Sequence, residues 1–126
     1  MDRSAVQAWL DRYVAAWRAN QPGPIEDLFA EDAVYGYRPW EGDDHTIRGR
    51  DAIVASWLEE PDEPVAWDAH YEPYVVEGDR AVAVGWSRYA ATSDAPERTY
   101  HNAYLLRFAP DGRCAEFREY YMEEGK

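Results

Sequence analysis

The stretch TYHNAYLLRFAPDGRCAEFREYYM, residues 99–122, reads as two β-strands joined by a turn. Both halves are rich in aromatic and aliphatic residues, and Pro110-Asp111-Gly112 between them is typical of a turn. Two similar strand patterns precede this stretch, and no helical pattern separates them. Neighbouring strands are therefore expected to pair in the antiparallel sense, because a parallel pair needs a long crossover. The predicted strands are residues 65–76, 81–92, 99–108 and 113–122.

The first part of the chain carries helical patterns instead. Residues 5–18 have apolar side chains at helical spacing, and Ser4 with Gln7 forms a capping-box signature at their start. A short second helix is predicted from Pro24, with Phe29 turned inward. Helices first and strands afterwards predict an α+β fold.

A brief strand at 33–37 and a polar loop at 38–48 connect these helices to a third one. The third helical pattern begins after Gly49 and is ended by Pro61. The length of 126 residues suits one domain, so residues 1–126 are predicted to form a single α+β domain with a bent antiparallel sheet.

The charge and the cysteine content exclude several kinds of partner. Asp and Glu number 25 against 13 Lys and Arg, and this net charge of −12 repels nucleic acid and anionic lipid. The single cysteine, Cys114, permits no intrachain disulfide, so a reducing, cytoplasmic location is expected. The N-terminus has no signal-peptide pattern, and no stretch has membrane-spanning length. We therefore expect no nucleic-acid or membrane partner.

The sequence shows no motif of a metal or cofactor site. His45, His70 and His101 are far apart and do not have the spacing of a zinc site. Neither a glycine-rich phosphate loop nor a nucleophile elbow is present. We expect a protein that works without metal or organic cofactor.

Four segments carry a family resemblance: DRYVAAW at 11–17, LFAEDA at 28–33, IRGRDAI at 47–53 and DGRCAEFREYY at 111–121. They resemble the nuclear transport factor 2-like superfamily and, within it, its SnoaL-like and ketosteroid-isomerase-like branches. The resemblance implies a cone-shaped, cystatin-like fold in which the sheet encloses three N-terminal helices. It does not select an activity, since such folds include isomerases, dehydratases, cyclases, epoxide hydrolases and non-catalytic binders.

The resemblance implies roles for four residues. Tyr13 matches the tyrosine of ketosteroid isomerases that donates to the substrate oxyanion, and Trp57 stands where those enzymes have a supporting tyrosine. Tyr37 replaces their base aspartate, and Tyr104 replaces their protonated, oxyanion-binding aspartate. A phenol with a pKa near ~10 can donate a hydrogen bond but is a poor base at neutral pH. Standard ketosteroid-isomerase chemistry is therefore not expected.

Strand alternation supplies another residue for proton transfer. If Tyr104 faces the pocket then Asn102 does too, and on the last strand Phe117, Glu119 and Tyr121 also face inward. Burial of Glu119 in an aromatic cone raises its pKa and suits it to general acid or base catalysis. The alternative is that a tyrosine or arginine partner satisfies Glu119, or that a bulge turns it to solvent.

The predicted site is thus an aromatic pocket for a small hydrophobic molecule, with Tyr13, Tyr104 and Glu119 as catalytic residues. The alternative is that many of these rings simply fill the cone. The predicted substrate-binding residues are Trp17, Tyr35, Tyr37, Trp40, Trp57, Asn102, Phe117 and Tyr121.

These residues favour a cofactor-independent isomerase, cyclase, dehydratase or hydrolase that acts on a hydrophobic carbonyl or polycyclic compound. Two rivals remain: a non-catalytic ligand-binding or dimerisation module, and a structural protein whose cavity is plugged by its own rings. Because proteins of this fold commonly pair through the convex sheet face, a homodimer is also expected. The pattern leaves open which sheet face carries Trp86 and Arg88.

Overall fold

The computed structural model describes residues 1–36, 46–59 and 66–125. Tyr37, Trp40 and most of the predicted loop lie outside the described residues. No helix within the described ranges is both long enough and apolar enough to cross a membrane. The elements are α1 (Arg3–Ala19), α2 (Pro22–Glu26), β1 (Phe29–Gly36), β2 (Thr46–Arg48), α3 (Arg50–Glu59), β3 (Trp67–Glu77), β4 (Arg80–Tyr89), β5 (Arg98–Phe108) and β6 (Cys114–Glu123).

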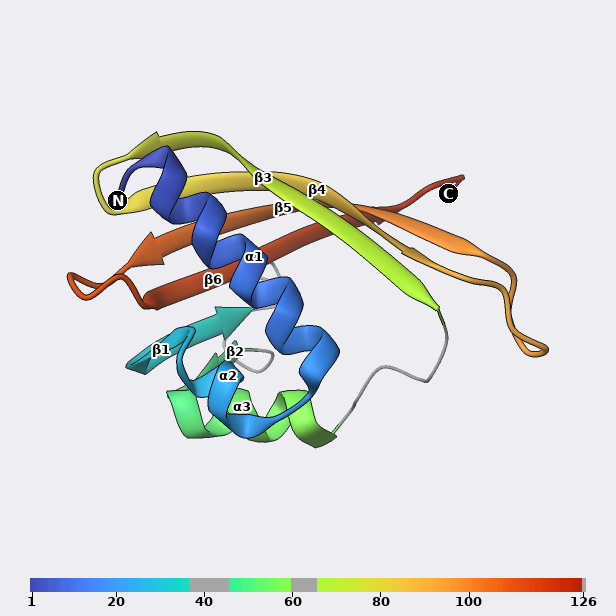
Figure 1. Ribbon diagram of the computed structural model, residues 1–126, viewed down its shortest axis with the longest axis horizontal. Coiled ribbons are helices and arrows are strands. Elements are labelled where there is room, and N and C mark those ends of the chain that lie inside the picture. Colours follow the sequence, from blue (N-terminus) through green and yellow to red (C-terminus); the bar gives the residue numbers. More distant parts are fainter. Residues whose placement is uncertain (37–45, 60–65, 126) are drawn as a thin grey trace.

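The strands form one curved sheet in the order β2-β1-β6-β5-β4-β3 (Figure 1). Strands β3 to β6 pair antiparallel with their sequence neighbours, as predicted. Strand β1 instead runs parallel to β6, with Tyr35 beside Phe117. This parallel pair is the exception to the predicted bent antiparallel sheet, because α3 and the intervening strands give the chain enough length to return in the parallel sense. The α+β fold with three helices and a bent sheet is confirmed.

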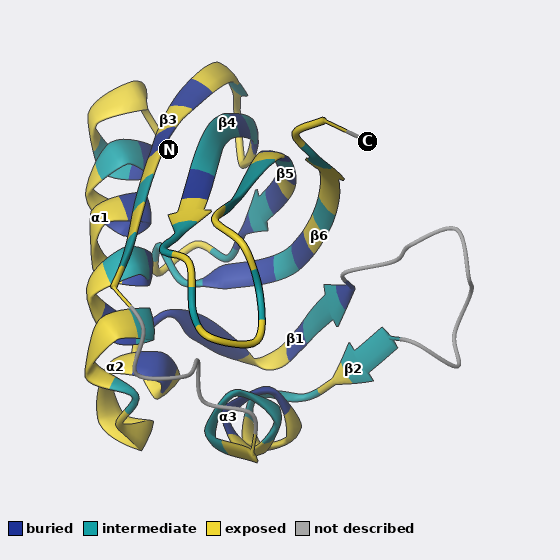
Figure 2. Ribbon diagram, turned by 90° about the vertical axis from the view of Figure 1, so that its right-hand side faces the viewer, coloured by how far each residue is buried: buried dark blue, intermediate teal, exposed yellow. Residues whose placement is uncertain are grey.

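Helix α1 lies in the curve of the sheet. In Figure 2 its buried side faces the strands and its exposed side faces outward. Trp9 anchors the helix, because its indole N–H donates to the carbonyl oxygen of Leu28 at 3.0 Å and its ring contacts Phe108 and Phe117. The buried residues of α1 recur at helical spacing: Val6, Trp9, Leu10, Tyr13 and Ala16.

The ends of several predicted elements shift where neighbouring groups decide them. The predicted Ser4 capping box is wrong, because Asp2 caps α1 by accepting a hydrogen bond from the backbone N–H of Ala5 at 2.8 Å. Phe29 opens β1 rather than extending α2, since it pairs with Cys114 of β6. The predicted loop is also wrong at Thr46–Arg48, which pairs with β1 as β2.

Gly85 permits a close approach between β3 and β4 on the inner face of the sheet. A Cβ at this position would overlap the carbonyl oxygen of His70 and the ring of Tyr71. Tyr71 is buried against this strand. The absence of a side chain at Gly85 is thus a packing requirement of the cone wall.

Candidate functional site

The three predicted catalytic residues converge inside the cone. The ring centroids of Tyr13, from α1, and Tyr104, from β5, are 5.6 Å apart. Tyr104 and Glu119 are direct partners across the β5–β6 pair. Glu119 is also near enough to Tyr13 for its charge to contribute to raising the pKa of that phenol. Residues far apart in the sequence therefore meet on the concave face.

Glu119 is half-buried, and burial raises the pKa of its carboxyl group to about 7. The side-chain amide of Asn102 donates to Glu119 Oε1 at 3.0 Å. This hydrogen bond lowers the pKa of Glu119, because it stabilises the charged form of the carboxyl group. Within the described residues, no Lys, Arg or His forms an ion pair with Glu119. Its partner is thus a neutral amide, and both protonation states are populated near neutral pH.

Asn102 is only 8% exposed, and its two amide atoms differ in their environment. The nitrogen donates to Glu119. The oxygen Oδ1 is buried and has no hydrogen-bond partner in the part of the chain that the structure describes. Buried acceptors in folded proteins are normally satisfied by protein, water or ligand, so this oxygen is available to accept a hydrogen bond from a molecule in the cone.

The phenol groups around Glu119 are hydrogen-bond donors rather than bases. Burial is the largest cause that raises the pKa of Tyr13, Tyr35 and Tyr104, and nearby phenols and Glu119 raise them further. The rings of Tyr13 and Tyr104 lie with their centroids 5.6 Å apart, so these phenols are close neighbours. These phenols therefore stay protonated at neutral pH and remain available as hydrogen-bond donors.

The remaining predicted ligand contacts divide between the interior and the rim of the cone. Phe117 is fully buried and stacks on Tyr35 with ring centroids 4.6 Å apart, and Trp57 meets Tyr13 edge-on at 5.4 Å. These rings fill much of the interior. Tyr121 lies nearer the end of β6 and is 41% exposed, and Trp17 lies at the C-terminal end of α1.

A row of aromatic rings continues from Trp17 along the ends of the strands. Its ring centroids follow one another at 4.3 to 6.2 Å. We call it the aromatic rim. Sequence reasoning did not select Trp67 or Tyr89 as site residues, although the period of two along each strand places them on the inner face with Tyr71 and Gly85. The aromatic rim consists of Trp67, Trp17, Tyr89, Tyr100 and Tyr121.

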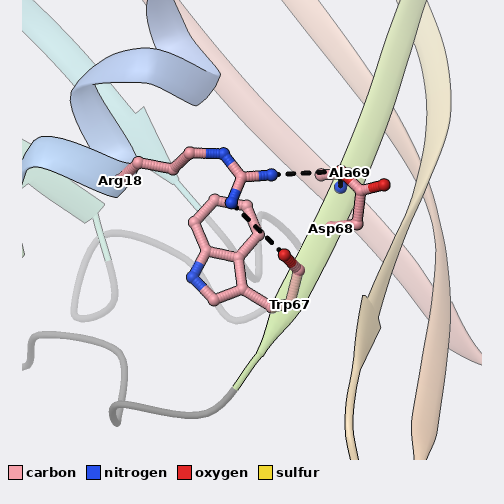
Figure 3. A network of polar contacts seen from close by, with 4 residues as sticks. All are labelled: Arg18, Trp67, Asp68 and Ala69. Carbon is pink, nitrogen blue, oxygen red and sulfur yellow. Dashed lines mark hydrogen bonds and ion pairs between the residues drawn. The ribbon is translucent and has the colours of Figure 1, made fainter.

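Arg18 connects α1 to one end of this rim (Figure 3). Its guanidinium carbon lies 4.1 Å from the centre of the Trp67 ring, and its nitrogens donate to the carbonyl oxygen of Trp67 and to Asp68 Oδ1 at 3.3 and 3.0 Å. Because Arg18 and Asp68 are both exposed, their ion pair contributes little stability by itself. Its main effect is to fix the orientation of the Trp67 ring.

The outer face of the sheet carries the residues that the sequence pattern left unassigned. Ala83 and Ser87 of β4 are buried on the inner face. Trp86 and Arg88 alternate with them and therefore lie on the outer face. Trp86 stands between His70 and His101 across the strands.

Comparisons with known proteins agree with this architecture. A family model described as the SnoaL-like domain matches residues 10–117. The chain belongs to the SnoaL-like family. No curated protein shows significant similarity to this SnoaL-like chain. In the described residues, no group of three or more His, Cys, Asp or Glu could hold a metal ion.

Solved structures share the fold of this SnoaL-like chain. A nuclear transport factor 2-like protein of unknown function from Mesorhizobium loti is 24% identical, with coverage of 97% and 95% of the two chains and a TM-score of 0.64. An epoxide hydrolase of the LEH-like type from M. tuberculosis is 11% identical, with coverage of 95% and 84% and a TM-score of 0.68. A Bacillus subtilis protein that is provisionally named an isomerase is 17% identical, with coverage of 97% and 90% of the two chains and a TM-score of 0.74. Likeness at these identities shows the fold alone.

Proposed function

We propose that this SnoaL-like chain binds a small, largely apolar carbonyl compound inside the cone and transfers a proton on it through Glu119. The observation that carries the proposal is the position of Glu119, a half-buried carboxyl group with a pKa of about 7 beside buried phenols. A group that exists in both protonation states near neutral pH can take a proton from carbon and return it.

The neighbouring donors complete the scheme. As Glu119 removes a proton from the carbon next to the carbonyl, negative charge develops on the carbonyl oxygen. A hydroxyl of Tyr13 or Tyr104 donates to that oxygen, and the fixed donors stabilise the enolate-like state. Glu119 then returns the proton to another atom of the substrate. These proton-transfer steps would suit an isomerase or a dehydratase, and they use only side chains of this protein.

A second candidate is a non-catalytic carrier that uses the same cone. Tyr37 in place of a base aspartate supports it, as does the close packing of Phe117 with Tyr35. A carrier would bind the same compounds without exchanging their protons. The two functions therefore differ in one measurable property.

Proton exchange on an aromatic ketone tests the proposal. 2-Acetylnaphthalene is incubated with the protein in D2O, and loss of the methyl proton signal is followed by NMR. We expect wild type to accelerate exchange and Glu119→Gln to abolish the acceleration, with the dissociation constant changed by less than about threefold. Glu72→Gln, on the exposed outer face, is the matched control and keeps the wild-type rate.

Each other outcome has a defined meaning. A full rate in Glu119→Gln removes Glu119 as the base. Binding without exchange by wild type selects the carrier. No binding of the ketone by any variant contradicts a site in the cone, and then ring packing of the interior becomes the better description.

We also propose that the chain forms a homodimer through the outer face. Hydrophobic side chains there are open to water, with Val75 49%, Leu105 37% and Met122 66% exposed. A groove of about 380 Å³ crosses this face and is lined in part by Val82, Leu105 and Arg107. Arginines from β4, β5 and β6 also lie on the outer face. Their positive charges offset part of the net charge of −12, so two copies repel each other less through this face than through the rest of the surface.

Sedimentation velocity tests this pairing. Leu105→Glu is expected to shift a dimer to monomers, because it places a charge in the apolar part of the groove. Ala8→Glu on the exposed side of α1 adds the same charge elsewhere and leaves the dimer intact. A monomeric wild type at micromolar concentration would contradict the proposal. A cytoplasmic location is proposed as well, supported by the single cysteine, which is buried.

A further inference from the structure

The unpartnered oxygen of Asn102 identifies a chemical group of the ligand. We infer that the ligand carries a hydroxyl group that donates a hydrogen bond to Asn102 Oδ1, next to the carbonyl on which Glu119 acts. The substrate class is then a hydroxylated carbonyl compound rather than a simple ketone. This inference rests on the proposed function.

When Glu119 is ionised, its carboxylate fixes the orientation of the Asn102 amide. Its nitrogen donates to Glu119 Oε1 at 3.0 Å, and the reverse orientation would set the amide oxygen against an ionised carboxylate. Oδ1 therefore faces away from Glu119. It remains a buried acceptor without a partner in the described residues, and Asn102 is 8% exposed.

The strands beside Asn102 do not supply the missing donor. Its partner on β4 is Gly85, which has no side chain. Its partner on β6 is Tyr121, which is 41% exposed and makes no hydrogen bond to Oδ1. The described residues therefore supply no donor, and we assign this role to a ligand in the cone.

Among the oxygen-containing groups of an uncharged carbonyl compound, a hydroxyl is the one that can act as this donor. A carbonyl or ether oxygen has no proton to give to Oδ1. An ammonium group would pair with the carboxylate of Glu119 and hold it ionised, which conflicts with proton return. A hydroxyl satisfies Oδ1 and leaves the second oxygen of Glu119 free for proton transfer. The phenols of Tyr13 and Tyr104 remain available for the carbonyl oxygen.

A matched pair of ketones tests the inference. The probes are 2-acetylnaphthalene and 2-(hydroxyacetyl)naphthalene, which differ by one hydroxyl, and their dissociation constants are measured by calorimetry. A site with a buried unpaired acceptor discriminates strongly against an analogue that lacks the donor. We expect the hydroxy ketone to bind wild type about tenfold to a hundredfold more tightly.

Three variants locate the effect. Asn102→Leu removes the acceptor at similar size, so the preference for the hydroxy ketone should fall to about onefold. Asn102→Asp keeps an acceptor at the same place and should keep the preference for the hydroxy ketone. If Asn102→Leu does not fold, Asn102→Asp is the variant that tests the role of this acceptor. Glu119→Gln should keep the preference as well, because the hydroxyl contacts Asn102.

The outcomes separate this inference from the proposed function. Equal binding of both ketones to wild type overturns the inference, for instance because an ordered water already satisfies Oδ1. The proposed function would stand in that case if exchange on 2-acetylnaphthalene still depends on Glu119. A preference that survives in a folded Asn102→Leu variant also overturns the inference. If neither ketone binds, both proposals are wrong.

Discussion

The raised pKa of Glu119 makes the stability of the protein depend on pH in a way that one substitution isolates. The carboxyl group has an ordinary value of 4.5 in the unfolded chain and about 7 in the folded one. Below pH 4.5 it is protonated in both states and does not affect stability. As pH rises from 4.5 to 7, the unfolded state ionises first, so the folded state loses stability relative to the unfolded one.

The magnitude follows from the difference between the two pKa values. At about 1.36 kcal/mol for each pKa unit, the loss amounts to about 3 kcal/mol between pH 4 and pH 8. Glu119→Gln has no such titration. The variant should therefore gain about 3 kcal/mol in free energy of unfolding relative to wild type across this range.

Urea unfolding followed by tryptophan fluorescence measures this difference at pH 4, 5, 6, 7 and 8. The other ionisable groups are present in both proteins, so the difference between the two curves reports Glu119. Glu72→Gln provides the baseline for loss of an exposed carboxylate. A stability difference between Glu119→Gln and wild type that is constant with pH would refute the desolvation of Glu119.

Three further predictions follow from contacts described above. Asn102→Leu removes the hydrogen bond that lowers the pKa of Glu119, so NMR titration of the Glu119 carboxyl carbon should give a value above about 7. Gly85→Ala should lower the free energy of unfolding by about 3 kcal/mol or more in urea unfolding, because its methyl group overlaps the backbone of β3. Gly23→Ala meets no atom beyond its chain neighbours and should cost about 1 kcal/mol or less, an amount that reflects the following Pro24. The Cys114 thiol is fully buried and its pKa is raised by burial, so it should react with a disulfide reagent only when the protein unfolds; fast reaction under native conditions would contradict its burial.

The β3–β6 part of the sheet and the inward orientation of Asn102 and Glu119 were predictable, because the alternation of side chains along a strand depends only on the local sequence. Strands β5 and β6 pair in unbroken register from Tyr100 to Arg107, so inward positions chosen from the sequence stay inward in the structure. The sequence did not predict the register that places Asn102 beside Glu119, and it named a tyrosine or an arginine as the possible partner of Glu119. The hydrogen bond between them depends on their diagonal arrangement across two strands, which the pairing supplies.

Features set by distant parts of the chain were not predictable in this way. Phe29 has no local preference that distinguishes a helix end from a strand start, and its pairing with Cys114 decides it. Strand β2 exists because β1 offers an edge to pair with. Trp67 and Tyr89 lay within predicted strands, but their contact with Trp17 depends on where α1 ends above the sheet.

The position of β6 has a consequence for biosynthesis. This strand is translated after every other element of the sheet, yet it lies between β1 and β5 in the interior of the sheet. Until it emerges from the ribosome, the edges of β1 and β5 that β6 covers are open in addition to those of the edge strands β2 and β3, and Glu119 is absent. Closure of the cone and arrival of Glu119 beside Asn102 are therefore one late event, and a ribosome stalled before this strand would hold an aggregation-prone chain with an incomplete cone.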